Sequence, residues 1–395
     1  MPPETAPAEN LAHYPPAAST TRPGKSTSII AQFRRRLVAN PRFRRFVERA
    51  PLLRRLASSS ANEVFALTSG FINSQILLAC EELDLFDALA TGPASPAELA
   101  RQWQMTPDRA STLLTAAEGL KLVYRTGDGQ FGLDEYGIVI AQSPGIRAMI
   151  RHHAAVYRDL TDPVALLRAP KSDTQTSSFW SYVGEGDAWG RHVGAPDAAQ
   201  YSTLMRLSQA MVIEQVLDAY PIGRHHARLI DIGGGNGAFI TGAAKRWDTL
   251  NVGVFDLPAV AENASEQLAG TSFADRLSIY GGSFFEHQIP PDADCYSLIR
   301  VLYDHNDDAA LSILRNVRAA MAPGDVLVIG EPMAGEKAGE RLVQAYFSIY
   351  LLAMQSGKCR SAGQLSDLAR KAGFADIRQV ATALPVISGL LVAKA

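Results

Sequence analysis

Apolar residues recur at helical spacing through most of the first 220 positions, and beyond them they gather into short runs. Recurrence every three to four residues predicts helices over 63–89, 96–102, 107–120, 146–160, 162–167 and 198–219. The later runs predict strands over 228–232, 250–255, 277–281, 295–302 and 326–331. Helices are expected between them, for example over 238–247 and 309–321. Buried strands alternating with helices are typical of an α/β fold with a doubly wound, mostly parallel sheet.

Two short strand patterns, 122–126 and 130–133, flank Gly127-Asp128-Gly129. An Asp-Gly pair between strands is a strong hairpin signal. Helices followed by a hairpin give the outline of a winged helix, which binds DNA in many proteins. This stretch has few basic residues where a recognition helix would need them, so the pattern favours a structural or dimerising role.

The chain divides by pattern into five parts. We expect a disordered Pro- and Ala-rich leader over 1–25, a basic amphipathic arm over 26–61 and a winged-helix-like dimerisation domain over 62–145. A helical connector that also forms the acceptor pocket would cover 146–220, and a catalytic domain would cover 221–395. The stretch 29–56 holds nine arginines interleaved with Phe and Leu. Two interpretations stay open for it: an arm packed on a partner subunit, or a helix on an anionic membrane surface.

The formal net charge of −2 gives no sign of a nucleic-acid partner. Cys80, Cys295 and Cys359 lie far apart without CxxC spacing, which argues against a disulfide framework or a zinc site and fits a reducing cytoplasm. The sequence has no uninterrupted apolar run of about 18 residues and no readable signal peptide.

The most informative stretch is Asp231-Ile232-Gly233-Gly234-Gly235-Asn236-Gly237, where an apolar strand runs into a glycine cluster before a helix. Such a turn brings backbone N–H groups close to a ligand at the helix N-terminus. Asp256 ends the next strand and can accept hydrogen bonds from ribose hydroxyls. A dinucleotide is the competing ligand, because the turn also satisfies the relaxed G-x-G-x-x-A pattern. Asp231 favours a cationic methyl donor, since a carboxylate there would repel a pyrophosphate.

Four further segments accompany this turn along the chain: Phe255-Asp256-Leu257-Pro258, 281–285, 301–308 and 321–324. Together they resemble the S-adenosylmethionine-dependent O-methyltransferases typified by plant phenolic enzymes and bacterial carotenoid enzymes. The resemblance implies homodimers with a helical, winged-helix-like N-terminal domain and a Rossmann-like catalytic domain. Segments 70–80, 160–167 and 346–354 are most similar to the hydroxyneurosporene (demethylspheroidene) branch of purple photosynthetic bacteria.

The resemblance also implies roles for individual residues. The donor, S-adenosyl-L-methionine, which leaves as S-adenosyl-L-homocysteine, would be held by Asp231, Gly233, Gly234, Gly235, Gly237, Asp256, Leu257, Ser283, Phe284 and Arg300. The catalytic candidates are His305, Tyr303, Asp304 and Glu331. The acceptor pocket would be formed by His152, His153, Trp180, Met205, Tyr346, Tyr350 and Met354.

The catalytic set departs from the phenolic enzymes. Tyr303 stands where those enzymes have a histidine base, His305 stands where they have tryptophan, and Cys359 replaces a supporting glutamate. His305 is the better base by its ordinary pKa, with Asp304 or Glu331 to orient it, whereas Tyr303 fits the register and would act as a relay. The choice between His305 and Tyr303 is open at this point.

The expected reaction is methylation of the tertiary C-1 hydroxyl of an acyclic carotenoid. We expect the enzyme in the cytoplasm, with peripheral contact at the inner membrane surface. Three alternatives stay open. The acceptor could be a phenolic or polyketide metabolite, or the enzyme could methylate a carbon of a bacteriochlorophyll-type tetrapyrrole. The third alternative is a winged-helix regulator with a vestigial donor site. No metal is expected.

Overall fold

The computed structural model describes residue 40 and the ranges 51–169, 174–179 and 196–395. The predicted leader, most of the basic arm and the pocket candidate Trp180 therefore lie outside the described residues. The chain divides into two units, Met1–Asn73 and Ser74–Ala395, and each is described by itself.

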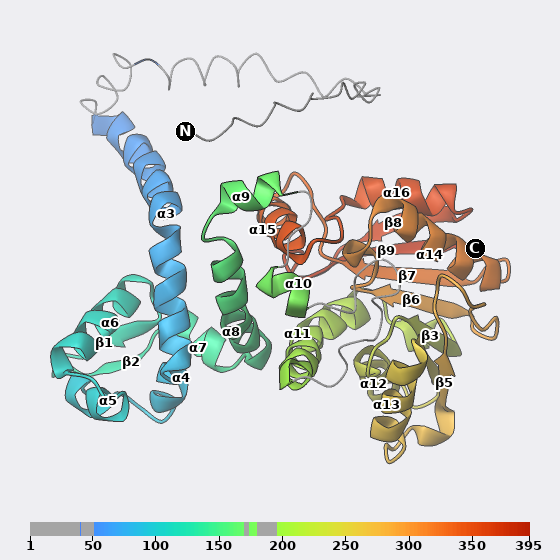
Figure 1. Cartoon of the computed structure of the whole chain (residues 1–395), viewed down its shortest axis with the longest axis horizontal. Coiled ribbons are helices and arrows are strands. Elements are labelled where there is room, and N and C mark those ends of the chain that lie inside the picture. The colour runs from blue at the N-terminus through green and yellow to red at the C-terminus, as the bar shows by residue number, and fades with distance from the viewer. Residues whose placement is uncertain (1–39, 41–50, 170–173, 180–195) are drawn as a thin grey trace, which may run out of the picture. The chain divides into compact units, whose positions relative to one another are not determined.

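Figure 1 shows the elements in chain order. The helices are α3 (Pro51–Glu82), α4 (Leu85–Ala88), α5 (Pro96–Gln102), α6 (Pro107–Gly119), α7 (Glu135–Ala141), α8 (Pro144–Asp159), α9 (Pro163–Arg168), α10 (Gln175–Phe179), α11 (Pro196–Ala219), α12 (Ala238–Arg246), α13 (Pro258–Leu268), α14 (Asp307–Ala320), α15 (Ala338–Met354) and α16 (Ala362–Lys371). The strands are β1 (Val123–Arg125), β2 (Phe131–Leu133), β3 (Arg228–Ile232), β4 (Asn251–Asp256), β5 (Leu277–Gly281), β6 (Cys295–Ile299), β7 (Val326–Glu331), β8 (Ala375–Val380) and β9 (Gly389–Lys394). The predicted helices and strands with described residues are present, with ends that shift by a few residues, except that the helix expected over 63–89 is divided and the strand expected over 295–302 ends at Ile299.

Within the first unit, the described part of α3 carries large apolar side chains in solvent. Phe65, Leu67 and Phe71 are 71%, 82% and 69% exposed. By length and composition the stretch Ala61–Glu82 is also apolar enough to cross a membrane, with 11% of its most apolar window buried. Its Asn and Ser residues interrupt the apolar run, which is why a count of consecutive apolar residues does not find it. An exposed apolar helix face is typical of a protein or membrane interaction surface.

The winged-helix outline is confirmed by α5, α6 and the β1–β2 hairpin. Ser95 and Glu98 form a reciprocal capping box that fixes the start of α5. The hairpin is antiparallel, with Val123 opposite Leu133. The single helix expected over 63–89 is wrong, because Asp84 takes a left-handed backbone conformation (φ 53°) and separates α4 from α3.

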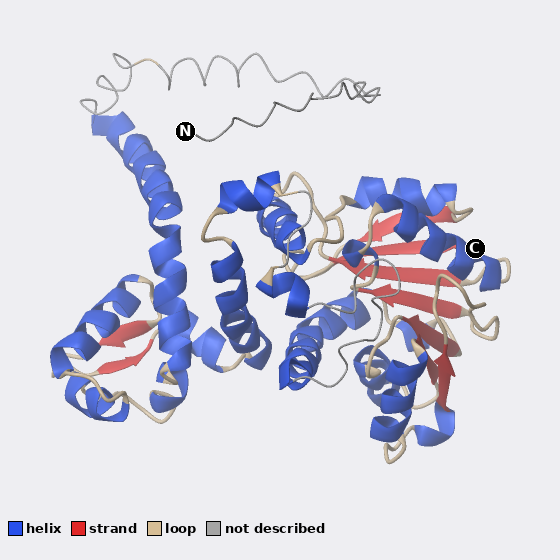
Figure 2. Ribbon diagram, viewed as in Figure 1, coloured by secondary structure: helices blue, strands red, loops and turns tan. Residues whose placement is uncertain are grey.

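The C-terminal half of the chain is built on a seven-stranded sheet in its described part, in the order β5-β4-β3-β6-β7-β9-β8 (Figure 2). Strands β3 to β7 pair in parallel, as predicted. The C-terminal strands were not predicted: β9 runs antiparallel to β7, and β8 runs antiparallel to β9. The chain thus ends in a hairpin that extends one edge of the sheet.

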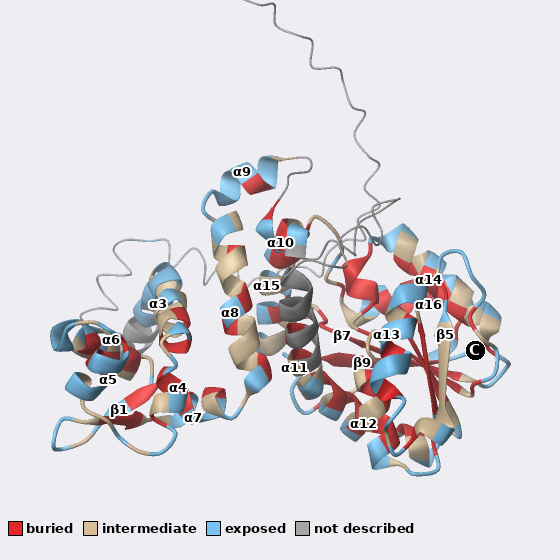
Figure 3. Ribbon diagram, turned by 60° about the horizontal axis from the view of Figure 1, so that its bottom comes forward, coloured by how far each residue is buried: buried red, intermediate tan, exposed pale blue. Residues whose placement is uncertain are grey.

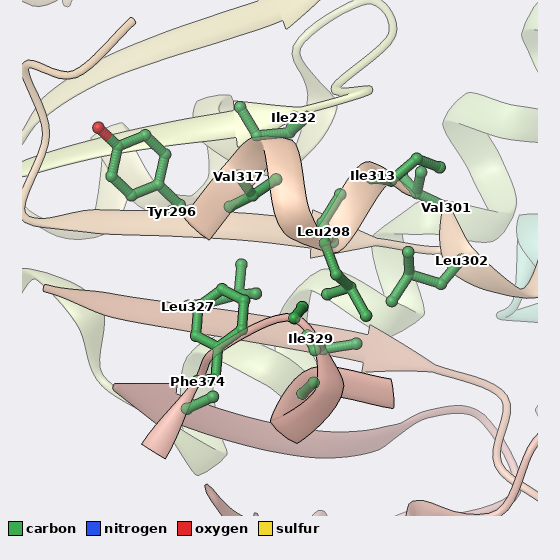
Figure 4. Packing of buried hydrophobic residues seen from close by; sticks show 14 of the residues in the cluster. Ile232, Tyr296, Leu298, Val301, Leu302, Ile313, Val317, Leu327, Ile329 and Phe374 are labelled. Carbon is green, nitrogen blue, oxygen red and sulfur yellow. The ribbon is translucent and has the colours of Figure 1, made fainter. Parts of the chain in front are cut away.

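Alternate residues of the central strands enter two separate cores. Ile230 and Leu298 face a core that α14 and α16 complete, and Figure 4 shows their neighbours Leu327, Ile329 and Phe374 packed together. Leu229 and Val328 face the opposite core, with α11 and α12. Figure 3 shows the resulting buried interior of the sheet. Burial on both faces explains why the strands read as continuous apolar runs.

Candidate active site

The glycine turn joins β3 to α12 at the carboxyl edge of the sheet. Gly233, Gly235 and Gly237 have φ values of 68°, 59° and 76°, where other L-residues are strained. At Gly235 an added Cβ would meet no atom within 4 Å, so the turn faces open space there. At Gly234 the same atom would come within 2.9 Å of Asp231 Oδ2. The glycines therefore bring backbone close to a buried carboxylate beside an open space.

Asp231 is fully enclosed in β3. The Ser297 hydroxyl donates to its Oδ1 at 2.6 Å. Burial raises the pKa of Asp231 to about 7, and the negative charge of Asp256 adds to the increase. Among the described residues no ion pair joins Asp231, and a cationic ligand group would stabilise its ionised form.

Asp256 ends β4 beside the same turn. Its Oδ2 accepts the Gly235 N–H and its Oδ1 accepts the Leu257 N–H, both at 2.7 Å. Burial raises its pKa, and these two hydrogen bonds oppose the increase. Because each carboxylate oxygen has a second lone pair, Asp256 can still accept two ligand hydroxyls.

The loop after β5, the strand beyond β4 in the sheet, also approaches the turn. An added Cβ at Gly233 would lie 3.6 Å from the Phe284 ring. Phe284 and Phe285 form an edge-on pair with centroids 4.8 Å apart. The Ser283 hydroxyl accepts the Phe285 N–H at 3.2 Å. The predicted donor residues of this loop are thus brought to the glycine turn, with aromatic surface suited to a flat base.

The segment after β6 turns sharply instead of continuing as strand to residue 302. Arg300 has φ 58°, and its N–H donates to Gly330 O at 2.8 Å. Glu331 Oε1 accepts the Val301 and Leu302 N–H groups at 3.0 and 2.7 Å. Arg360, which sequence reasoning missed, donates to the carbonyl groups of Leu302 and His305 at 2.8 and 2.7 Å. These bonds fix a 3-10 turn over Leu302–Asp304.

The turn places Tyr303 and His305 in different surroundings. Tyr303 is buried in an apolar cluster that contains Val156, Tyr350, Leu351 and Met354, with Tyr346, Phe347 and Cys359 packed against it. The His305 ring instead meets Phe284 and Phe285 edge-on, with both centroid distances 5.6 Å. Burial and then the Arg360 charge lower the pKa of His305 to about 4. His305 is therefore neutral, and it lies against the loop that borders the glycine turn.

Two histidines of α8 meet two tyrosines of α15. His152 Nε2 and Tyr350 Oη are 2.7 Å apart, and so are His153 Nε2 and Tyr346 Oη. The two tyrosine rings stack with centroids 5.5 Å apart. Burial lowers the pKa of His152 to about 4 and also lowers that of His153. Four of the predicted pocket residues therefore lie together. Each imidazole is hydrogen-bonded to one of the tyrosine hydroxyls, and both kinds of group are uncharged.

The sequence placed two further residues in the pocket. Met354 lies in the Tyr303 cluster, at 3% exposure. Met205 lies on α11, in a part of the helix whose side chains are not described. The roles of all the site residues remain predictions. Residues that sequence reasoning missed include Ser297, Ser208 and Phe347, which carry no local motif.

We expect Asp256→Ala to weaken binding of the methyl donor at least tenfold, or about 1.4 kcal/mol. The side chain both positions the Gly235 N–H and offers acceptors to the ligand. Calorimetric titration with S-adenosylmethionine measures the change, and a thermal melt shows whether the fold is retained. An unchanged affinity would remove Asp256 from the donor site.

Comparison with known proteins identifies the family. Residues 157–375 match the O-methyltransferase domain model, and residues 65–137 match the O-methyltransferase dimerisation domain model. The chain is 37% identical over 344 residues to demethylspheroidene O-methyltransferase of Cereibacter sphaeroides, covering 87% of this chain and 89% of that protein. It is 36% identical to the protein of the same name from Rhodobacter capsulatus, covering 96% and 92%.

Solved structures agree on the fold. Human N-acetylserotonin methyltransferase in complex with SAM superposes with a TM-score of 0.68 at 23% identity, covering 85% of this chain and 97% of that one. The methyltransferase CalO1 of calicheamicin biosynthesis, with SAH bound, gives a TM-score of 0.71 at 24% identity, covering 85% and 98%. The dimerisation domain supports assembly as a homodimer. The chain belongs to the S-adenosylmethionine-dependent O-methyltransferase family.

Proposed function

We propose that this enzyme transfers a methyl group from S-adenosylmethionine to the tertiary C-1 hydroxyl of a hydroxylated acyclic carotenoid. The observation that carries the proposal is the match, over most of the chain, to two proteins named demethylspheroidene O-methyltransferase. The Tyr303 cluster supports it independently, because its side chains are aromatic and aliphatic and the histidines bonded to Tyr346 and Tyr350 have lowered pKa values. Apolar surroundings with few polar groups suit a long apolar acceptor with one hydroxyl.

The donor residues fit the methyl donor in charge and in space. Asp231 and Asp256 offer two buried carboxylates, and the glycine turn leaves open space at Gly235. Asp231 would hold the donor's cationic amino acid part, Asp256 the ribose hydroxyls, and Phe284 with Ser283 the adenine side. When bound, the donor supplies an electrophilic methyl group on a cationic sulfur.

The protein then contributes position, exclusion of water and removal of one proton. Holding the acceptor oxygen in line with the methyl group supplies much of the rate acceleration. A tertiary alcohol is too weak an acid to ionise beforehand, so a basic group must take its proton as the new bond forms. Tyr303 is the catalytic candidate buried in the apolar cluster, and we assign the contact with the acceptor hydroxyl to it. His305, between the two phenylalanines, is assigned to the donor side.

An acceptor panel tests this function. The purified enzyme is incubated with labelled S-adenosylmethionine and with acyclic carotenoid C-1 alcohols, simple phenols, a polyketide phenol or a bacteriochlorophyll-type tetrapyrrole, all in the same detergent. We expect label in the carotenoid alcohols alone. Preferential labelling of a phenol or the tetrapyrrole would replace the proposed acceptor.

We further propose that this cytoplasmic enzyme reaches its apolar acceptor at a membrane surface through the basic arm. Nine arginines lie between residues 29 and 56 of a chain whose formal net charge is only −2, so any attraction to anionic lipid is local. Deleting residues 1–50, which stops before α3 begins, should abolish salt-sensitive sedimentation with anionic vesicles and leave donor affinity unchanged.

A matched deletion of residues 1–28 keeps the arginines and should keep vesicle binding. Measuring the dimer mass of each variant separates this role from the competing one. A loss of dimerisation in the longer deletion would make the arm a brace between subunits. If the intact protein ignores anionic vesicles at low salt, the membrane role is wrong.

A further inference from the structure

Four side chains with hydrogen-bonding or charged groups come together around the turn after β6. They are Arg300, Tyr303, Asp304 and Glu331, and Tyr303, Asp304 and Glu331 are at most 8% exposed. Among the described residues, two buried carboxylate oxygens have no hydrogen-bond partner: Asp304 Oδ1 and Glu331 Oε2. An unpartnered buried carboxylate oxygen is costly, so its presence at a candidate active site calls for a reason.

The hydrogen bond between Arg300 and Tyr303 has a fixed direction. Arg300 Nη2 donates to Tyr303 Oη at 3.3 Å, and Nη1 donates to Ser208 Oγ on α11 at 2.9 Å. Guanidinium groups only donate, so the Tyr303 oxygen must accept from Arg300. The hydroxyl proton of Tyr303 is then directed elsewhere, and the neighbouring Asp304 carboxyl, whose pKa Tyr303 lowers as a donor, has one oxygen without a partner to receive it. The second lone pair of the Tyr303 oxygen stays available to accept one further proton.

We propose that Tyr303 and Asp304 form a proton relay for methyl transfer, with Arg300 as the positioning residue that sets its direction. The proposal rests on the proposed function, because it gives the acceptor hydroxyl proton a destination. As the acceptor oxygen bonds to the methyl carbon, the methyl–sulfur bond breaks and its electron pair stays on sulfur. The acceptor proton passes to Tyr303 Oη, and the proton of Tyr303 passes to the Asp304 carboxylate. The neutral carboxylic acid later releases that proton to solvent.

Glu331 controls when Asp304 is able to accept. Burial raises the pKa of Asp304 well above its ordinary value, the Glu331 charge raises it further, and Arg300 and Tyr303 lower it. Burial also raises the pKa of Glu331 to about 7, while the Leu302 and Val301 N–H groups and Arg360 lower it. Other titratable groups lie on the elements packed around the Tyr303–Asp304 turn. They are His305, Cys359 of the loop before α16, Tyr346 and Tyr350 of α15, and His152 of α8.

The sign of the pH dependence follows. Asp304 can accept a proton only when it is ionised, so the single-turnover rate should rise with pH through the pKa of the coupled pair. Glu331→Gln removes a negative charge and keeps an oxygen for the Val301 and Leu302 N–H groups. It should lower the pKa of Asp304 and shift this limb of the profile toward acid by about one pH unit.

The experiment compares Asp304→Asn and Glu331→Gln with Asp367→Asn, a matched carboxyl-to-amide control on exposed α16 that pairs with Arg370. Single turnover with saturating donor and a carotenoid alcohol is followed from acid to alkaline pH. We expect Asp304→Asn to lose about 10²-fold in rate and the pH dependence with it. The control should behave as wild type, and calorimetry should give all variants the same donor affinity.

Infrared spectroscopy without acceptor keeps the test independent of the acceptor's identity. In wild type, protonated Asp304 should give a carboxylic-acid carbonyl band that disappears only at unusually high pH. This band should be absent in Asp304→Asn, and in Glu331→Gln it should disappear at lower pH. If the wild-type enzyme shows this band but produces no methylated carotenoid, the proposed function is wrong and the relay still stands. An unshifted pH limb in Glu331→Gln, or a near-wild-type rate in Asp304→Asn, would overturn the relay.

Discussion

Tyr303→Phe is expected to lower the single-turnover rate of methyl transfer about 10²-fold, the usual scale of an acid–base contribution. Phenylalanine keeps the ring in the Tyr350 and Met354 cluster but removes the oxygen that accepts from Arg300. His305→Ala should cost less in this step, because the imidazole lies between Phe284 and Phe285. Its effect should fall on donor affinity instead.

Rapid-quench kinetics with saturating donor separates these two outcomes, and titration calorimetry of each variant measures donor binding. The reverse ranking, with His305→Ala the slower variant at equal donor occupancy, would return the role of base to His305. Near-wild-type rates for both variants would mean that catalysis rests on positioning alone.

Donor affinity should fall as the pH drops below about 7, by up to tenfold per pH unit, because Asp231 must be ionised to pair with a cation. The raised pKa has a consequence for the free protein. Between the ordinary carboxyl range and about 7 the folded state holds a proton that the unfolded state has released. The contribution of Asp231 to stability therefore decreases as pH rises through that window.

Asp231→Asn tests this assignment. Asparagine keeps an oxygen for the Ser297 hydroxyl but has no charge. A hydrogen bond to a charged group contributes roughly 1.5–3 kcal/mol, so donor affinity at pH 8 should fall about tenfold to a hundredfold. The pH dependence below 7 should flatten. Calorimetric titrations at several pH values would contradict the assignment if wild type and variant showed the same slope.

The sequence predicts the structure correctly where the backbone conformation depends on neighbouring residues alone. Gly233, Gly235 and Gly237 have positive φ, and the strand before them is apolar apart from Arg228 and Asp231, so turn and strand were both predictable. Asp256 was predictable for the same reason, because a polar residue at the end of a buried parallel strand lies at the ligand edge of the sheet. The C-terminal hairpin was missed, although 389–393 is apolar and fully buried.

The choice between Tyr303 and His305 could not be made from sequence. It depends on the backbone reversal at Arg300 and on the turn that Glu331 and Arg360 hold from 28 and 57 residues further along the chain. Both contacts are long-range, and neither residue forms a motif with the turn it fixes. Without that turn, strand alternation would have continued to residue 302 and would have put these side chains elsewhere.

Product analysis tests the central claim most directly. The wild-type enzyme is given methyl-labelled S-adenosylmethionine and an acyclic carotenoid bearing a tertiary C-1 hydroxyl, and the product is examined by mass spectrometry and NMR. We predict one added methyl group per reacting hydroxyl, observed as a methoxy group on C-1, together with an equal amount of S-adenosylhomocysteine. Label on carbon, or donor consumption only with a phenol, would contradict carotenoid O-methylation as the function.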